Sequence, residues 1–328
     1  MVIRDRLPKG FVLAKPIAQE GYDEKEIYEL ERQGRLIITR KRDGWKMLAL
    51  VCSDRRVRIY TDGINQIDSR LDHIKKELRS FGFPPQTLFV GEAFVFDNNG
   101  NEDLGKTISF FHSKKENLHL CGGTIFFMVF GIIDLSKNPK SYNVDWFKPI
   151  DSLSRGCQFD PLLAGTHRER TNYVFSMSFE KGTFDENKKR AIDEGWEGLV
   201  LYDKDYQLTY RTDGKAPARP KGCNKWKPIY EDDFIVREWI PRPDGTAKEL
   251  VLLQIDPKTG KEFECGKLGS FNNTMRKSLS CERYPLVVQA KFEARYPKSG
   301  KIRNARFMRT RDDKPAEQCI APKSYVFK

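Results

Sequence analysis

Three strongly apolar segments decide most about how this chain of 328 residues can fold. They cover residues 87–96, 124–135 and 199–202, and their side chains are mostly β-branched or aromatic. Such side chains favour β-strands, and each run is shorter than the roughly 20 residues that a membrane-spanning helix needs. The segments therefore predict central strands of a buried sheet, and we expect no membrane partner.

Shorter elements are predicted around these strands. Strands over 36–38 and 45–51 lie on either side of the tight turn Lys41-Arg42-Asp43-Gly44. Apolar residues recur at 4, 3, 4 spacing from Ile67 to Leu78, which predicts an amphipathic helix with a buried stripe. Helices are also expected over 22–32 and 184–194, each with a glycine just beyond its end.

An acidic cluster at residues 230–233 marks the predicted boundary between two domains, 1–232 and 233–328. Beyond it, short strand-like runs alternate with turn signals at 243–245, 257–260 and 297–300. This pattern is typical of a small β-barrel such as an OB-fold, which often binds nucleic acid.

The positive charge of the chain is concentrated in the second predicted domain. The formal net charge is +12, and residues 233–328 hold 20 Lys and Arg against 12 Asp and Glu, a net +8. A phosphate backbone is a common target for such a surface, because its condensed counterions are released on binding. A solvated basic face that keeps the protein in solution is the alternative.

Cysteine and histidine offer no recognisable site. The seven cysteines are scattered without a CxxC pair, and the four histidines lack the spacing of a metal pair or a triad. Reduced thiols in a cytoplasmic protein are expected, since residues 1–6 also lack the apolar core of a secretory signal. Any chemistry must therefore rest on Lys, Arg, Asp and Glu.

The turn Lys41-Arg42-Asp43-Gly44 is a candidate for that chemistry. A lysine attacks phosphorus only when its amine is neutral, which requires neighbouring cations or burial. The turn would present Lys41 at the open end of a sheet. Surface turns also contain Lys, Asp and Gly for reasons of turn conformation alone, so the tetrapeptide needs support from elsewhere in the chain.

Four further residues, in three segments of the chain, suggest a bound ligand. Glu92 interrupts an apolar strand, where a carboxylate is costly unless it binds something, although an edge glutamate facing solvent is equally compatible. Glu197 opens the strand 199–202, where it suits a divalent metal or is merely a charge after a helix. Lys225 and Lys227 share one face of an extended segment, which suits a polyphosphate or an ordinary exposed pair.

The order of these elements resembles the covalent nucleotidyltransferases, which comprise ATP-dependent DNA ligases, RNA ligases and mRNA capping enzymes. The family series is KxDG, GE, an aromatic strand, EG with a hydrophobic run, KxK and finally RxDK. In this chain the series is Lys41-Arg42-Asp43-Gly44, Gly91-Glu92, Phe127-Met128-Val129-Phe130, Glu197-Gly198-Leu199-Val200, Lys225-Trp226-Lys227 and Arg311-Asp312-Asp313-Lys314.

The resemblance implies an α+β fold: an ATP-grasp-like nucleotidyltransferase domain of antiparallel sheets with flanking helices, followed by the OB-fold domain. It also implies a reaction, in which Lys41 attacks the α-phosphate of ATP, and a divalent metal, Mg²⁺ or Mn²⁺, held by Glu197. For the nucleoside, the resemblance implies that Glu92 binds the ribose and that Phe130, or less favourably Phe127, stacks on the adenine. For the phosphates, it implies that Lys225 and Lys227 contact the α-phosphate and that Arg311 and Lys314 orient the pyrophosphate. It also implies a catalytic role for Asp43 and nucleotide contacts by Thr39, Arg40 and Lys46.

Within the family, the chain resembles the minimal two-domain DNA ligases of phage and bacterial type. The basic, aromatic approach to Arg311 and the segment 224–228 carry this choice. It implies a monomer that seals 3′-hydroxyl/5′-phosphate breaks in nicked duplex DNA during repair, replication or recombination. An RNA ligase, a GTP-dependent capping guanylyltransferase and an inactive nucleic-acid-binding protein are the alternatives.

Two positions depart from the family pattern. Many DNA ligases have Arg as the second residue after KxDG, whereas this chain has Lys46, which keeps the charge and loses the bidentate fork. The Ser-Arg pair expected before a later glycine is replaced by Thr61-Asp62-Gly63. Arg58 is a conjectural substitute for the missing arginine.

Overall fold

The computed structural model describes residues 5–67, 70–98, 100–113, 123–136, 141–145 (backbone only), 173–296 and 299–322. The chain divides into two compact units, Met1–Trp226 and Lys227–Lys328. None of the helices in these ranges is long and apolar enough to cross a membrane. The five cysteines within them are free thiols, as expected, while Cys121, Cys157, His119 and His167 lie outside the described residues.

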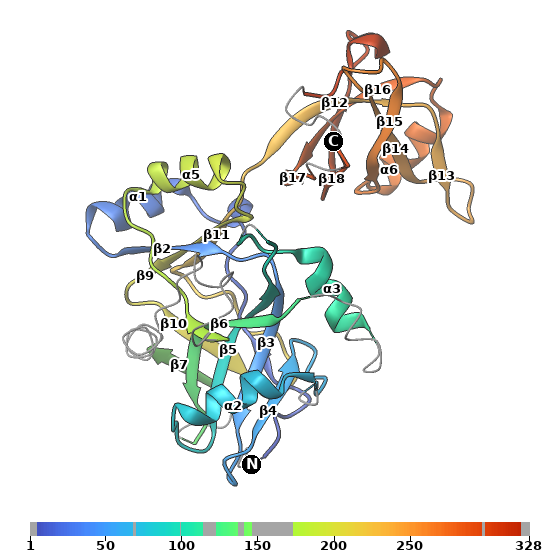
Figure 1. Ribbon diagram of the computed structural model, residues 1–328. Helices are drawn as coiled ribbons and strands as arrows, with labels where there is room; N and C mark the ends of the chain where they lie inside the picture. The colour runs from blue at the N-terminus through green and yellow to red at the C-terminus, as the bar shows by residue number, and fades with distance from the viewer. Residues whose placement is uncertain are drawn as a thin grey trace. The chain divides into compact units, whose positions relative to one another are not determined.

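The first unit is built on a five-stranded sheet of order β4-β3-β5-β6-β8 (Figure 1). The two longest apolar segments form β5 and β6, which confirms them as central strands. Side chains such as Leu48, Phe89 and Phe127 are 0–1% exposed in its core. All pairs are antiparallel except β6–β8. The strands are β3 (Trp45–Val51), β4 (Val57–Thr61), β5 (Thr87–Val95), β6 (Ile125–Asp134) and β8 (Val174–Ser176).

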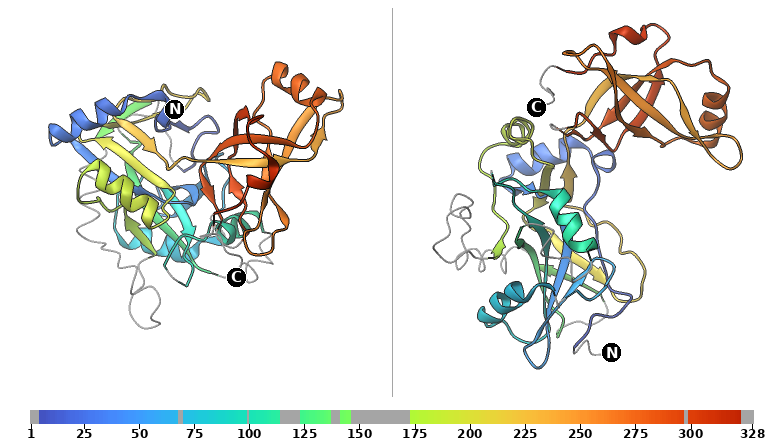
Figure 2. Two further views of the ribbon diagram at one scale, coloured as in Figure 1. Left: turned by 90° about the horizontal axis from the view of Figure 1, so that it is seen from above. Right: turned by 45° about the vertical axis from the view of Figure 1, so that its right-hand side comes forward.

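A second sheet, of order β11-β9-β2, carries the predicted nucleophile on β2 (Leu36–Lys41). Its other strands are β9 (Gly198–Asp203), which contains the third apolar segment, and β11 (Cys223–Trp226). Helices α1 (Glu24–Arg32) and α5 (Phe184–Asp193) lie side by side over this sheet (Figures 1 and 2) and confirm two predicted helices. Thr183 and Glu186 form a capping box at the start of α5, which fixes where the helix begins.

The remaining elements of this unit lie at the edges of the two sheets. Helix α2 begins at Asp72, so the predicted start at Ile67 is wrong. The Ile67 amide instead donates to the Ile59 carbonyl of β4 at 2.9 Å, which holds this residue against the sheet. The other elements are a small sheet of order β1-β10-β7 with β1 (Val12–Leu13), β7 (Ser141–Asp145) and β10 (Gln207–Arg211), the helices α2 (Asp72–Ser80) and α3 (Leu104–His112), and the 3₁₀ turn η1 (Gln19–Gly21).

The second unit is a six-stranded antiparallel sheet around its own core, which includes Phe234, Leu250 and Val288. The predicted turns at 243–245 and 257–260 are confirmed between consecutive strands, whereas 297–298 lie outside the described residues. The elements are β12 (Tyr230–Val236), β13 (Trp239–Pro241), β14 (Ala247–Ile255), β15 (Glu262–Leu268), α6 (Asn273–Cys281), β16 (Leu286–Phe292), β17 (Ala294–Arg295), β18 (Ile302–Arg303), β19 (Arg306–Thr310) and η5 (Ala316–Gln318).

Two expectations about this unit differ from the structure. The order β13-β14-β12-β16-β19, with β15 beside β14, is an open sheet, and no pairing among the described strands closes it into a barrel. The units divide after Trp226, six residues before the predicted boundary at 232. The reason is that β12 pairs with β16 from Tyr230 onward, so the acidic cluster is already part of the second sheet.

Candidate active site

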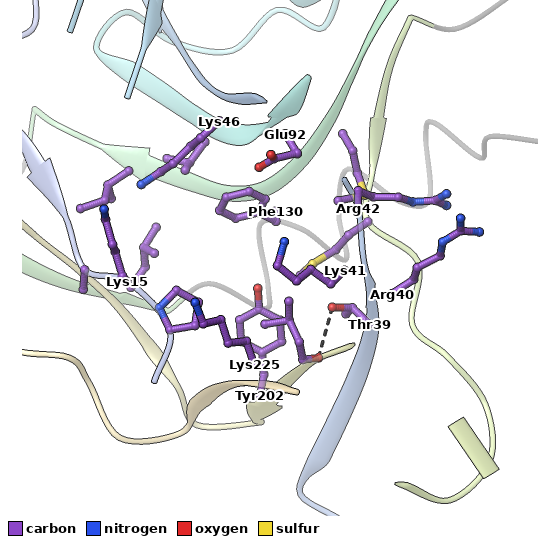
Figure 3. Close-up of a pocket in the computed structure, with 18 residues that line it drawn as sticks. Lys15, Thr39, Arg40, Lys41, Arg42, Lys46, Glu92, Phe130, Tyr202 and Lys225 are labelled. Atoms are coloured by element: carbon purple, nitrogen blue, oxygen red, sulfur yellow. Dashed lines mark hydrogen bonds between the residues drawn. The ribbon is translucent and has the colours of Figure 1, made fainter. Parts of the chain in front are cut away.

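A cavity of about 230 Å³ opens in the first unit, lined by residues from all three of its sheets (Figure 3). Seven residues named from the sequence line it: Thr39, Arg40, Lys41, Lys46, Glu92, Phe130 and Lys225. They come from five strands, β2, β3, β5, β6 and β11, that lie far apart in the sequence. Cationic side chains and one carboxylate therefore surround a largely apolar space.

Lys41 ends β2 with its amine directed into this cavity, as Figure 3 shows. Side chains alternate along a strand, so Lys41 shares a face with Thr39, whose hydroxyl donates to the Val200 carbonyl at 3.3 Å. Lys41 pairs in register with Gly198 of β9, next to Glu197. The Lys41 amine donates to the Glu197 carboxylate, so two residues 156 positions apart are in contact.

Glu92 and Lys46 face each other across β3 and β5, in direct register. Burial at the cavity wall raises the pKa of Glu92 to about 8, the nearby positive charge of Lys41 lowers it, and the negative charge of Glu197 raises it further. The Lys46 amine forms an ion pair of 2.9 Å with Asp62. Asp62, at the place of the missing arginine, thus contacts the cavity lysine, whereas Arg58 is not among the lining residues and donates to Gln66.

The apolar part of the cavity suits a flat base. Phe130 of β6 lies in the wall, whereas Phe127 is fully buried in the core, so the alternative stacking residue is wrong. The other side chains of this part are those of Val90, Met128, Met177, Val200, Tyr202 and Leu208.

The remaining predicted residues lie apart from this wall. Asp43 is in the turn after β2 and is not among the lining residues. Lys227 belongs to the second unit, where its amine donates to Glu293 at 2.6 Å. Arg311 and Lys314, of the same unit, both bind the Asp233 carboxylate, at 3.1 and 2.8 Å. Three of the residues predicted to bind phosphates, Lys227, Arg311 and Lys314, thus have carboxylate partners within the second unit.

Two features of the site were not predicted. Lys15 lines the cavity because residues 15–17 run beside β11, where the Lys225 amide donates to the Ile17 carbonyl at 2.9 Å. No local pattern in the sequence signals this contact. Glu102 binds both Arg40 and Arg42, and here a signal did exist: three consecutive cations at 40–42 call for an anion.

The residues around the cavity fit a divalent cation held through one protein ligand. Glu197 supplies a carboxylate next to Lys41, and Mg²⁺ characteristically uses one or two carboxylates with water and phosphate oxygens. Among the described residues, the group of three potential ligands whose donor atoms converge within 4.8 Å is Asp5, Cys52 and Asp54, none of which lines the cavity. Among the described residues, the cavity therefore lacks a complete set of protein ligands for a metal ion.

Comparison with known proteins shows the fold. No family model matches the sequence, and no curated protein matches it. Among solved structures, one described as "Pmar-Lig_Pre." covers 93% of this chain and 69% of its own, with 17% identity and a TM-score of 0.66. A structure from a study of Lig E DNA ligases, "DNA binding with a minimal scaffold", covers 94% of this chain and 100% of its own, with 19% identity and a TM-score of 0.59. The chain therefore has the fold of these two structures, and at this identity the likeness shows the fold alone.

Proposed function

We propose that the protein is an ATP-dependent DNA ligase that forms a covalent lysyl-AMP on Lys41. The observation that carries the proposal is the Lys41 amine itself. It projects into a cavity with an apolar part for a base, further lysines for phosphates and a carboxylate, Glu92, for a ribose. The fold shared with minimal DNA ligases supports DNA as the partner.

In the first step, the neutral Lys41 nitrogen attacks the α-phosphorus of ATP. A phosphorus–nitrogen bond forms, the bond to pyrophosphate breaks, and the attacking nitrogen releases one of its two protons. The AMP then passes to the 5′-phosphate of the break, which releases Lys41. Finally, the 3′-hydroxyl attacks this phosphate and expels AMP. Glu197, which accepts a hydrogen bond from the amine, orients the nucleophile before the attack.

The other site residues receive roles that match their positions. Glu92 binds the ribose hydroxyls, Phe130 stacks on adenine, and Lys225 contacts the α-phosphate, where its charge stabilises the transition state. Thr39, Arg40 and Lys46 complete the nucleotide pocket. We also propose that Lys227 joins Lys225 at the phosphate, that Arg311 and Lys314 orient the pyrophosphate, and that Asp43 acts in the transfer of AMP.

Glu197 is the residue that we propose to hold the metal, Mg²⁺ or Mn²⁺. Bound there with phosphate oxygens, such an ion supplies electrostatic stabilisation of charge on the transferred phosphate. We further propose that the first unit is the nucleotidyltransferase domain. The second unit, whose described strands form an open sheet, is proposed to be a partly open OB-fold domain that binds nicked duplex DNA. The protein acts as a monomer in the cytoplasm, in DNA repair, replication or recombination.

Incubation with α-labelled ATP or GTP, followed by denaturing electrophoresis, tests the proposal. We expect label from ATP on the wild-type protein and none on Lys41→Ala. Lys189→Ala removes an exposed lysine of α5 that pairs with Asp193, and it should label normally. Label from GTP alone would point to a capping guanylyltransferase, and label on Lys41→Ala would refute the nucleophile. Sealing of nicks in all-DNA against RNA-containing duplexes then separates DNA from RNA ligase activity.

A further inference from the structure

A cluster of three charged residues lies behind the nucleophile. Glu102 is bound by the guanidinium groups of Arg40 and Arg42, one on each carboxylate oxygen. The Arg40 bond measures 2.7 Å. The side chains of Arg40, Arg42 and Glu102 are 15%, 13% and 6% exposed, so water competes little with these ion pairs. We call these three residues the Glu102 cluster.

The Glu102 cluster contains the two residues that precede and follow Lys41 in the sequence. Arg40 precedes Lys41 on β2, so its side chain leaves the strand on the face opposite to that of Lys41. Arg42 follows β2 in the turn, and its guanidinium meets that of Arg40 on the Glu102 carboxylate. Figure 3 shows both guanidinium groups directed away from the side on which the Lys41 amine enters the cavity. Arg40 stacks over Trp196 at 5.0 Å, and Arg42 over Phe94 at 5.8 Å.

Glu102 is itself fixed by backbone contacts. It forms a β-bridge with Phe96, at the end of β5. The next amide, that of Asp103, donates to the Val95 carbonyl at 2.8 Å, and the Asp103 side chain caps α3. The backbone of Glu102 is thus held beside the end of β5, the strand that also carries Glu92. It links that strand to the two residues beside Lys41.

Charge balance makes the carboxylate hard to replace. The Nε atoms of Arg40 and Arg42 are buried and have no hydrogen-bond partner among the described residues. Burial also lowers the pKa of Arg40, whereas the charge of Glu102 raises it. Without Glu102, two adjacent buried cations would repel each other, and the turn between them would lose its fixed geometry.

We propose that Glu102 is a positioning residue, which holds Arg40 and Arg42 so that the Lys41 amine points into the cavity. The inference rests on the proposed function, since it assigns Glu102 to the reaction of Lys41. Glu102 is not among the residues that line the cavity. It binds Arg40 and Arg42, which do line it, and its effect on Lys41 passes through these two residues and the backbone between them. Loss of such alignment slows a reaction even when the substrate still binds.

The test compares Glu102→Gln with the double variant Glu102→Gln/Arg42→Gln, which restores the charge balance. Glu262→Gln is the matched control, because it neutralises a carboxylate that binds Arg237 in the second unit. The rate of lysyl-AMP formation is measured against ATP concentration. Amide hydrogen exchange of the peptide that contains residues 40–44 and the melting temperature are measured without nucleotide.

We expect Glu102→Gln to lower kcat by about 10- to 100-fold with KM for ATP changed less than about twofold. Exchange over 40–44 should quicken. The double variant should regain melting temperature and keep the low kcat. Recovery of kcat in the double variant would overturn the proposal, because Glu102 would then only balance charge. Unchanged kcat or exchange in Glu102→Gln would overturn it too. If the wild type takes no label, the proposed function fails, and the exchange measurement still decides the positioning role.

Discussion

At the scale of single residues, the Glu92 carboxyl is a cavity group whose ionisation the fold strongly disfavours. Its pKa is about 8 in the folded chain, against an ordinary value of 4.5. Below about pH 4.5 the carboxyl is protonated in both folded and unfolded chains. As pH rises towards 8, the unfolded chain releases this proton first, so the free energy of unfolding falls. Glu92 is thus a functional group that costs stability at neutral and higher pH.

Glu92→Gln should therefore stabilise the free protein at pH 8, by on the order of 2 kcal/mol, and change little at pH 5. The same variant should label poorly with AMP, since it loses the carboxyl group that we propose to bind the ribose. Urea unfolding at the two pH values measures the first effect. Glu262→Gln serves as the opposite control, because Arg237 lowers the pKa of Glu262 and the charged form is the stabilising one. A Glu92→Gln gain that is equal at both pH values would contradict the raised pKa.

The sequence predicted individual site residues well where each belongs to a short motif on a single strand. Lys41, Glu92, Phe130 and Lys225 are brought to one cavity. It could not predict Glu102 as the partner of Arg40, because nothing local fixes which acidic residue closes a contact 62 positions away. Such partners depend on tertiary packing and not on spacing along the chain.

At the scale of elements, the turn between β2 and β3 determines where Lys41 lies, and Gly44 is its tightest point. A Cβ atom on Gly44 would lie 2.5 Å from the Ala93 carbonyl oxygen and 2.9 Å from Cγ of Glu92. The glycine is therefore required because the turn packs directly on β5. This requirement couples the position of the nucleophile to that of Glu92.

Gly44→Ala should push the turn away from β5 and lower the rate of lysyl-AMP formation by about 100-fold, with a fall in melting temperature. Gly63→Ala is the control, since the nearest atom to its added Cβ lies at 3.5 Å and an alanine fits there. Both variants are compared by AMP labelling and by thermal unfolding. Normal labelling of Gly44→Ala would show that the turn can shift without moving Lys41.

Elements were predictable where apolar residues or caps repeat a clear pattern. Strands β5 and β6 and helices α1 and α5 match their expected segments. Helix α6 (Asn273–Cys281) was not predicted, because Leu279 is its one buried residue and gives no periodic stripe. Its start is fixed instead by Asn272, whose side chain accepts a hydrogen bond from the Met275 amide.

At the scale of the whole molecule, charge separates the two units. The second unit, residues 227–328, carries +7 of the net +12, which leaves +5 for the 226 residues of the first unit. In the second unit, β19 is an edge strand that exposes Arg306 and Arg309. A surface of this kind binds a phosphate backbone through counterion release, independently of base sequence. The proposed transfer of AMP to Lys41 takes place without DNA, so it does not require a phosphate backbone on this surface.

Two assays on one protein should therefore respond differently to salt. If the protein contacts about five phosphates, log affinity for nicked DNA against log salt has a slope of about −4 to −5. Affinity then falls by roughly a few hundred-fold between about 50 and 200 mM salt, whereas AMP labelling without DNA changes far less. Arg306→Ala and Arg309→Ala should each flatten the slope by about 1. Arg237→Ala is the control, because Glu262 already neutralises this guanidinium. Equal flattening by Arg237→Ala would show that net charge, and not β19, contacts the DNA.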